Sequence, residues 1–293
     1  MTGLSRTPAI PDGRKSSRII GIIGAGAIAS ELFSALAKHL DDPFESVVFL
    51  ARSGSESRPH AIAEQYSGVA KRFSVACNLE DFICENPGLV VECAGQRALA
   101  ETAERLLRAD IDVIGASIGA LADRGFRERL FNAQRESTAR LILPSGAVGG
   151  LDLLSAAGLA GIERLTYTGR KPPRAWLGTP AEAVVDLDKL ASSYLIYEGN
   201  AENAARAFPK NANAALAIGF SAAALDRMVV RLVADPEATG NVHQIRLESR
   251  VATMNVEVRA LPSQQNPKTS AIVGFSIANE ILKAGRWLRR DPL

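Results

Sequence analysis

The stretch RIIGIIGAGAIA, residues 18–29, starts as a short apolar run and ends in a turn that contains Gly24 and Gly26. Apolar runs without polar alternation are typical of strands buried on both faces of a parallel sheet. Residues 27–40 then carry apolar side chains at helical spacing. The order predicts a strand, a glycine turn and a helix. The segment before it, 1–17, is polar and rich in Pro, Gly and Ser, and we expect a disordered tail there.

The glycine turn fits the pattern G-x-G-x-x-G/A. Gly24 permits a tight turn, Gly26 lets the backbone approach a pyrophosphate, and the small Ala29 lets the helix pack closely on the strand. The N-terminal N–H groups of the helix then point at the phosphates. The stretch therefore predicts a dinucleotide-binding Rossmann unit, with cofactor contacts from Gly24, Gly26, Ala27 and Ile28.

Strands and helices alternate along the chain as far as residue 144. The expected strands are 46–50, 89–93, 113–114 and 141–144, and the expected helices are 61–66, 98–108 and 124–138. This alternation predicts a doubly wound parallel sheet in a domain at 18–145. Ala94 and Gly95 follow one of these strands and are small enough for a cofactor to pass close by, although an ordinary strand-to-helix turn explains them equally well.

The pattern changes after Pro144. SGAVGG at 145–150 is a flexible connection, followed by a helix at 151–160. The expected strands are then 162–168, 194–198, 228–234, 242–250 and 252–260, with one helix at 211–225. Strands that follow one another directly imply a one-sided, mainly antiparallel sheet. We therefore expect an α+β substrate domain at 146–268, and a last helix at 269–287 that packs back on the first domain.

The second strand ends in Leu50-Ala51-Arg52-Ser53, without the acidic residue that usually binds the ribose of NAD. An arginine at this place suits a 2′-phosphate. Arg52 therefore favours NADP over NAD, and the alternative is a solvated loop arginine.

The bulk composition excludes several classes of function. The 293 residues include 34 basic and 32 acidic side chains, a net charge of +2 that offers nothing to attract nucleic acid or a membrane surface. No apolar run is long enough to span a bilayer. Cys77, Cys84 and Cys93 are odd in number and lack a metal-ligand pattern, so we expect reduced thiols in a cytoplasmic protein and no metal site.

The chain has three histidines. His39 and His60 are expected at the surface. His243 lies where a loop meets a strand in the second domain, and an imidazole there can exchange a proton near neutral pH. From the residues alone, both a catalytic role and an ordinary structural role remain open for His243.

Several blocks of the second half resemble the L-aspartate dehydrogenase family in order and approximate spacing. The blocks are PSGAVGGLD (144–152), GNA (199–201), FPKNANA (208–214), ADP (234–236), NVHQI (241–245) and NPKTS (266–270). With the glycine turn, the resemblance covers residues 18–283. It implies oxidation of L-aspartate by NAD or NADP to iminoaspartate, which hydrolyses to oxaloacetate and ammonia or feeds NAD biosynthesis.

By this resemblance His243 matches the catalytic histidine, and Ala147 and Asn213 match cofactor-contacting positions. The substrate's two carboxylates need donors. Lys268, Thr269 and Ser270 stand together at an expected helix N-terminus, and Ser145 at the interdomain connection can line the same cleft. Helix capping is the alternative for the group at 268–270.

Two other readings stay open: an NADP-linked reductase of another small carboxylated imine or carbonyl compound, and a dinucleotide sensor without turnover. His243 favours an enzyme, because a sensor needs no proton-transfer residue. The open face and the edges of the second sheet also lead us to expect a homodimer.

Overall fold

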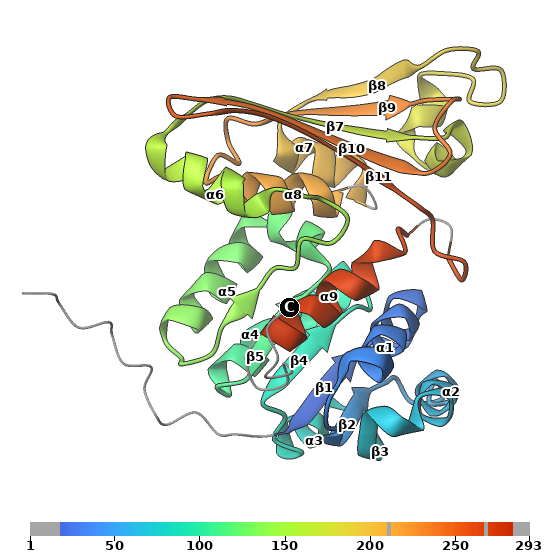
Figure 1. Ribbon diagram of the computed structural model, residues 1–293, viewed down its shortest axis with the longest axis vertical. Coiled ribbons are helices and arrows are strands. Elements are labelled where there is room, and N and C mark those ends of the chain that lie inside the picture. The colour runs from blue at the N-terminus through green and yellow to red at the C-terminus, as the bar shows by residue number, and fades with distance from the viewer. Residues whose placement is uncertain (1–17, 210–211, 267–268, 284–293) are drawn as a thin grey trace, which may run out of the picture.

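The computed structural model describes residues 18–209, 212–266 and 269–283. They form two sheets, one in each half of the molecule (Figure 1). The expected tail at 1–17, Lys268 and residues 284–287 of the expected last helix lie outside the described residues.

The first sheet is parallel throughout, in the order β3-β2-β1-β4-β5-β6. Its strands are β1 (Ile19–Ile23), β2 (Phe44–Leu50), β3 (Ala70–Ala76), β4 (Leu89–Glu92), β5 (Asp112–Gly115) and β6 (Leu141–Ile142). The helices of this half are α1 (Ala27–His39), α2 (Ser57–Gln65), α3 (Leu79–Cys84), α4 (Gln96–Arg108) and α5 (Arg124–Arg135), with 3-10 turns η1 (Ser67–Val69) and η2 (Ile118–Ala122). The predicted doubly wound sheet is confirmed.

Two elements of this half escaped prediction. Strand β3 is the edge strand next to β2, and its side chains at 71 and 72 are exposed. An edge strand of mixed polarity carries no continuous apolar run, so hydrophobic patterning does not reveal it. Helix α3 has six residues, which is too short for a helical stripe, and it begins where the Asn78 side chain accepts a hydrogen bond from the Asp81 N–H.

The second sheet has the order β11-β10-β7-β9-β8. Only β7 and β9 run parallel among its paired strands, so the predicted mainly antiparallel sheet is confirmed. Its strands are β7 (Ile162–Lys171), β8 (Tyr194–Gly199), β9 (Val229–Ala234), β10 (Asn241–Ser249) and β11 (Thr253–Ala260). The helices are α6 (Leu151–Ala160), α7 (Ala201–Ala207) and α8 (Ala212–Ser221), with 3-10 turns η3 (Pro173–Trp176) and η4 (Pro180–Ala183). Strand β7 is three residues longer than predicted, and α7 was not predicted.

Helices α7 and α8 lie between this sheet and the first half of the molecule, and no helix of the described residues covers the outer face of the sheet (Figure 1). Side chains alternate between the two faces accordingly. Leu165 and Tyr167 of β7 are buried on the inner face, whereas Arg164 is exposed and Thr166 half-buried.

No helix in the described ranges is long and apolar enough to cross a membrane.

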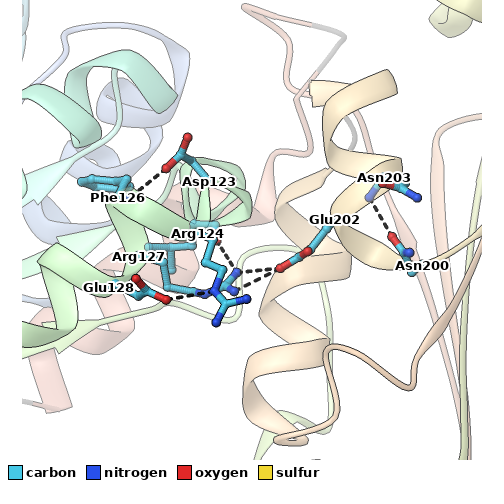
Figure 2. Close-up of polar contacts among 9 residues, drawn as sticks. Asp123, Arg124, Phe126, Arg127, Glu128, Asn200, Glu202 and Asn203 are labelled. Carbon is cyan, nitrogen blue, oxygen red and sulfur yellow. Dashed lines mark hydrogen bonds and ion pairs between the residues drawn. The ribbon is translucent and has the colours of Figure 1, made fainter.

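An ion pair joins the two halves (Figure 2). Both Nη atoms of Arg127, on α5, lie 3.0 Å from Oε1 of Glu202, on α7. The guanidinium also lies 5.9 Å from the ring centroid of Phe220, on α8. The two helices that carry the pair begin at side-chain caps, Asp123 for α5 and Asn200 for α7. Because Arg127 is only 15% exposed, this pair is screened less by water than a surface pair.

The last described helix, α9 (Ile272–Lys283), packs closely against α1 (Figure 1). A Cβ added to Gly274 would lie 2.8 Å from the carbonyl oxygen of Ile28, so only glycine fits at this crossing. The helix begins at Ile272 and not at residue 269, because Ser270 forms an antiparallel bridge with Pro262. Thr269 and Ser270, the described part of the expected helix N-terminus, therefore precede the helix, and the expected start at residue 269 is wrong.

Candidate active site

The glycine turn between β1 and α1 is shaped to hold a phosphate group. Gly24 has φ +106°, and a Cβ there would lie 2.8 Å from the backbone nitrogen of Ala94. A Cβ added to Gly26, the residue before α1, meets no atom within 4 Å. The space in front of the α1 N-terminus is thus open and edged by backbone N–H groups. These residues fit the pyrophosphate of a dinucleotide, with Ala27 and Ile28 in the first turn of the helix.

A buried carboxylate holds the next two turns together. Glu92, at the end of β4, has no exposed surface and accepts hydrogen bonds from the N–H groups of Ala94 (2.8 Å), Gly95 (2.7 Å) and Ser117 (3.1 Å) and from the Ser117 hydroxyl (2.9 Å). Burial raises the pKa of this carboxyl, and the four donors oppose that rise. Glu92 therefore joins the turn after β4 to the turn after β5. This role of Glu92 was not predicted, although a glutamate inside a buried strand is a sequence signal for it.

A cavity of about 170 Å³ lies between the two halves of the molecule. Its lining includes four groups of residues: Ile28 of α1 and Ser117 after β5; Ser145 and Ala147 of the connection; Tyr167, Lys171, Trp176, Asn213 and His243 of the second half; and Thr269 and Ser270 before α9. The cavity thus brings together residues far apart in the chain, several of them predicted site residues.

His243 lies on the inner face of β10, opposite Gly169 of β7. Its Nδ1 is 2.9 Å from the Tyr167 hydroxyl, and the two rings stack with centroids 6.0 Å apart. Its Nε2 is buried and has no hydrogen-bond partner among the described residues. Burial, and then the positive charge of Lys171, lower the pKa of His243 to about 4. The imidazole is therefore neutral at physiological pH.

Tyr167, Gly169 and Lys171 share the inner face of β7, since side chains alternate along a strand. A Cβ on Gly169 would lie 2.8 Å from the Tyr167 hydroxyl, so the missing side chain makes room for that hydroxyl beside His243. Burial lowers the pKa of Lys171 to about 8. Neither Tyr167 nor Lys171 was predicted. A strand ending at residue 168 left Lys171 out, although the alternation of T-Y-T-G-R-K continues to 171.

Asn213 extends from α8 across the boundary between the two halves. Its Oδ1 accepts a hydrogen bond of 2.8 Å from the Gly119 N–H in η2. This bond ties α8 to η2, and Asn213 also lines the cavity. Ala147 also lies in the cavity wall.

Some of the remaining predicted residues line the cavity, and the others lie outside its lining. Thr269 and Ser270 line the cavity, and Ser270 Oγ accepts a hydrogen bond of 2.8 Å from Asn241 Nδ2. Ser145 Oγ lies 3.0 Å from Ser276 Oγ of α9. Arg52 lies apart from this cavity, exposed in the turn after β2. Ala94 and Gly95 form the turn next to Gly24, and His39 and His60 are exposed.

Both halves of the chain match known families. Residues 24–144 match the family model described as homoserine dehydrogenase, NAD binding domain, and residues 152–284 match aspartate dehydrogenase, C-terminal. The L-aspartate dehydrogenase of Cupriavidus taiwanensis is 38% identical over 262 residues, which are 89% of this chain and 96% of that protein. That of Pseudomonas aeruginosa is 43% identical over 197 residues, 67% of this chain and 74% of that protein.

The solved structures agree with the sequence relatives. The crystal structure of aspartate dehydrogenase from Thermotoga maritima superposes with a TM-score of 0.70 at 26% identity, covering 94% of this chain and 98% of that one. Homoserine dehydrogenase from Thermoplasma acidophilum, at 13% identity and a TM-score of 0.54, shares the fold. The resemblance inferred from the sequence blocks is confirmed, and the chain belongs to the L-aspartate dehydrogenase family.

Proposed function

We propose that this protein oxidises L-aspartate with a nicotinamide dinucleotide, giving iminoaspartate and then oxaloacetate and ammonia. Family membership supports the reaction. The observation that carries the site is the buried Nε2 of His243, which has no partner among the described residues and stands in a cavity lined by both halves of the chain. When bound, the dinucleotide supplies the acceptor for the hydride that leaves Cα of aspartate.

His243 is the proton acceptor of this proposal. When Nδ1–H donates to the Tyr167 oxygen, the lone pair of the imidazole lies on Nε2, where it can take a proton from the substrate ammonium or from an attacking water. Tyr167 thus fixes the tautomer and the ring orientation. The neutral state of His243, which follows from its lowered pKa, is the state that a base requires.

The same arrangement supports the proposed cofactor and substrate contacts. The turn at Gly24, Gly26, Ala27 and Ile28 would hold the pyrophosphate. The small residues Ala94 and Gly95 would let the cofactor pass close by, and Ala147 and Asn213, which line the cavity, would contact it. Arg52, exposed after β2 where no acidic residue stands, favours NADP. Ser145, Thr269 and Ser270 offer hydroxyl groups to the substrate, and Lys268, outside the described residues, stays in this proposal as a further cation.

A homodimer that buries the outer face of the second sheet is part of the proposal. This face is rich in charge, and several of its charged side chains form ion pairs with one another: Arg164 and Arg246 with Glu248, and Arg231 with Glu198. Such balance lets the face pair with a copy of itself. Thr168→Arg, at the centre of the face, should give a monomer by light scattering, whereas Lys71→Glu in the first half should leave the mass unchanged. Equal masses for both variants and the wild type would exclude this face.

The three cysteines, at positions 77, 84 and 93, are free thiols. Free thiols suit a reducing compartment, and we therefore place the protein in the cytoplasm. Fractionation of cells that express the protein checks this assignment.

The proposed reaction is tested with a panel of L-amino acids and both dinucleotides, followed at the absorbance of the reduced nicotinamide. We expect turnover with L-aspartate, and consumption of reduced cofactor with oxaloacetate plus ammonia. If neither direction proceeds between pH 7 and 10 while the dinucleotide still binds, the aspartate assignment fails.

A further inference from the structure

One end of the cavity combines a lysine with a buried indole. Lys171 is the last residue of β7, and Trp176 closes η3, which begins two residues later. Pro172 and Pro173 explain why the helical turn begins so soon after the strand. Proline cannot continue the hydrogen-bond ladder of a sheet, and it favours the first turn of a helix. The chain thus folds back, and the Trp176 ring centroid comes to lie 5.9 Å from Lys171 Nζ.

The indole N–H of Trp176 needs a partner. Trp176 has no exposed surface, and its Nε1 has no hydrogen-bond acceptor among the described residues. Buried indole N–H groups are nearly always hydrogen-bonded, because a buried donor without an acceptor has lost its hydrogen bond to water and gained nothing in return. Phe208 packs edge-on against the indole at 5.9 Å and holds its orientation. Trp176 lines the cavity, and its N–H has no acceptor among the described residues, which indicates that a ligand supplies one.

The same end of the cavity is positively charged. Lys171 and Trp176 both line the cavity, together with His243. An ammonium group and an indole N–H offer only donors, and their shared preference is an anionic oxygen acceptor. A carboxylate has two such oxygens and can take one hydrogen bond from each donor.

We propose that Lys171 and Trp176 bind a carboxylate of the substrate beside His243. This inference rests on the proposed function for the identity of the substrate, and it assigns a carboxylate site that the predicted residues at 145 and 268–270 do not include. It gives the enzyme a reason to prefer acidic amino acids, because an uncharged side chain or ester offers the lysine no anionic oxygen and leaves the indole N–H without an acceptor among the described residues.

The test replaces each donor while keeping its shape. Lys171→Met keeps the aliphatic stem, and Trp176→Phe keeps an aromatic ring without the N–H. We expect each variant to raise KM for L-aspartate about 10- to 100-fold, the range for losing a hydrogen bond to a charged group, with unchanged affinity for the dinucleotide. Lys189→Met is the matched control, because Lys189 is an exposed lysine of the same half and pairs with Asp186; its KM should equal that of the wild type.

Substrate analogues identify which carboxylate is bound. L-Asparagine keeps the α-carboxylate and lacks the β-carboxylate. If the site takes the β-carboxylate, the preference of wild type for aspartate over asparagine collapses in Lys171→Met. If it takes the α-carboxylate, the KM values for both substrates rise by the same factor in Lys171→Met. Both results support a carboxylate site. A KM within twofold of wild type in both variants, with loss of thermal stability alone, would overturn it.

Failure of this inference is distinguishable from failure of the proposed reaction. Succinate, a dicarboxylate that cannot be oxidised at an amine, is titrated into the protein loaded with reduced dinucleotide and followed by calorimetry. We expect binding by wild type and Lys189→Met, and a loss of at least tenfold in Lys171→Met and Trp176→Phe. Equal succinate affinity in all four proteins contradicts the site even if aspartate is turned over. Selective loss supports the site even if aspartate is not the substrate.

Discussion

The Tyr167 hydroxyl lies 2.9 Å from Nδ1 of His243, and Gly169, between Tyr167 and Lys171 on β7, supplies the room for this contact. The pair joins neighbouring strands β7 and β10 on the face that lines the cavity. A tyrosine that accepts from Nδ1–H leaves the base position on Nε2. The catalytic proposal therefore depends on a contact between strands that are far apart in the sequence.

Tyr167→Phe should lower kcat about tenfold, because the imidazole loses the group that fixes its tautomer. The expected change in the free energy of unfolding is about 1 kcal/mol, the net value of one hydrogen bond. Steady-state kinetics and urea unfolding measure the two quantities. Tyr197→Phe, on the nearby strand β8, is the control; a kcat equal in both variants argues against a tautomer-fixing role.

His243→Gln should lower kcat by about 10² or more while the affinity for reduced dinucleotide stays the same. General base catalysis contributes about 10²–10⁴ in rate, and glutamine has no basic nitrogen. Stopped-flow turnover and cofactor fluorescence measure the two effects. The exposed His60→Gln serves as control. A His243→Gln enzyme with near wild-type turnover removes this residue from the mechanism.

The buried histidine should make folding stability depend on pH. Its pKa in the native state is about 4, below the ordinary 6.5, so the unfolded chain binds more protons between these values. This contribution is present above pH 6.5 and is lost as the pH falls toward 4. One proton gives at most about 1.4 kcal/mol per pH unit. Urea unfolding at several pH values measures how the free energy of unfolding changes with pH. Between pH 4 and 6.5 this change should be smaller in His243→Gln than in the wild type, and an identical pH dependence refutes the assignment.

The same argument applies to Lys171 at higher pH. Its native pKa is about 8, below the ordinary 10.5, so Lys171 adds stability as the pH rises from 8 to 10.5. Lys171→Met should flatten the stability curve in that range. Because the charge of Lys171 also lowers the pKa of His243, the variant should weaken the pH dependence between 4 and 6.5 as well. Urea unfolding of the two proteins between pH 7 and 10 checks this, with Lys189→Met as the control.

Glu92→Gln should weaken both folding and cofactor binding. The amide nitrogen would face N–H groups of Ala94, Gly95 or Ser117 that now donate to the carboxylate. We expect a loss of about 1.5–3 kcal/mol in the free energy of unfolding and a tenfold higher Kd for the dinucleotide. Glu101→Gln, which removes an exposed ion pair with Arg97, should change the stability by less than about 1 kcal/mol.

Arg52→Ala should lower the ratio of kcat/KM for NADP over NAD about tenfold, because the 2′-phosphate loses a cation. The exposed Arg58→Ala, on α2, should leave this ratio unchanged. Kinetics with both dinucleotides measure the ratio. If the wild type uses both equally and Arg52→Ala changes neither, the NADP preference is refuted.

Local sequence determined the strand-turn-helix unit at 18–39. The apolar run, the two glycines and the helical spacing of apolar side chains all lie within this one short segment. The family blocks in the sequence also predict His243 and Asn213 as site residues, and both line the cavity. Tertiary structure alone decided that Lys171 and Trp176 share a cavity with His243. The pairing of β7 with β10 sets those contacts. It puts Gly169 opposite His243, although the two residues are more than seventy positions apart in the sequence. Periodicity within one segment holds no information on which strands pair or in which register, and a burial-induced pKa shift exists only once the cavity has formed.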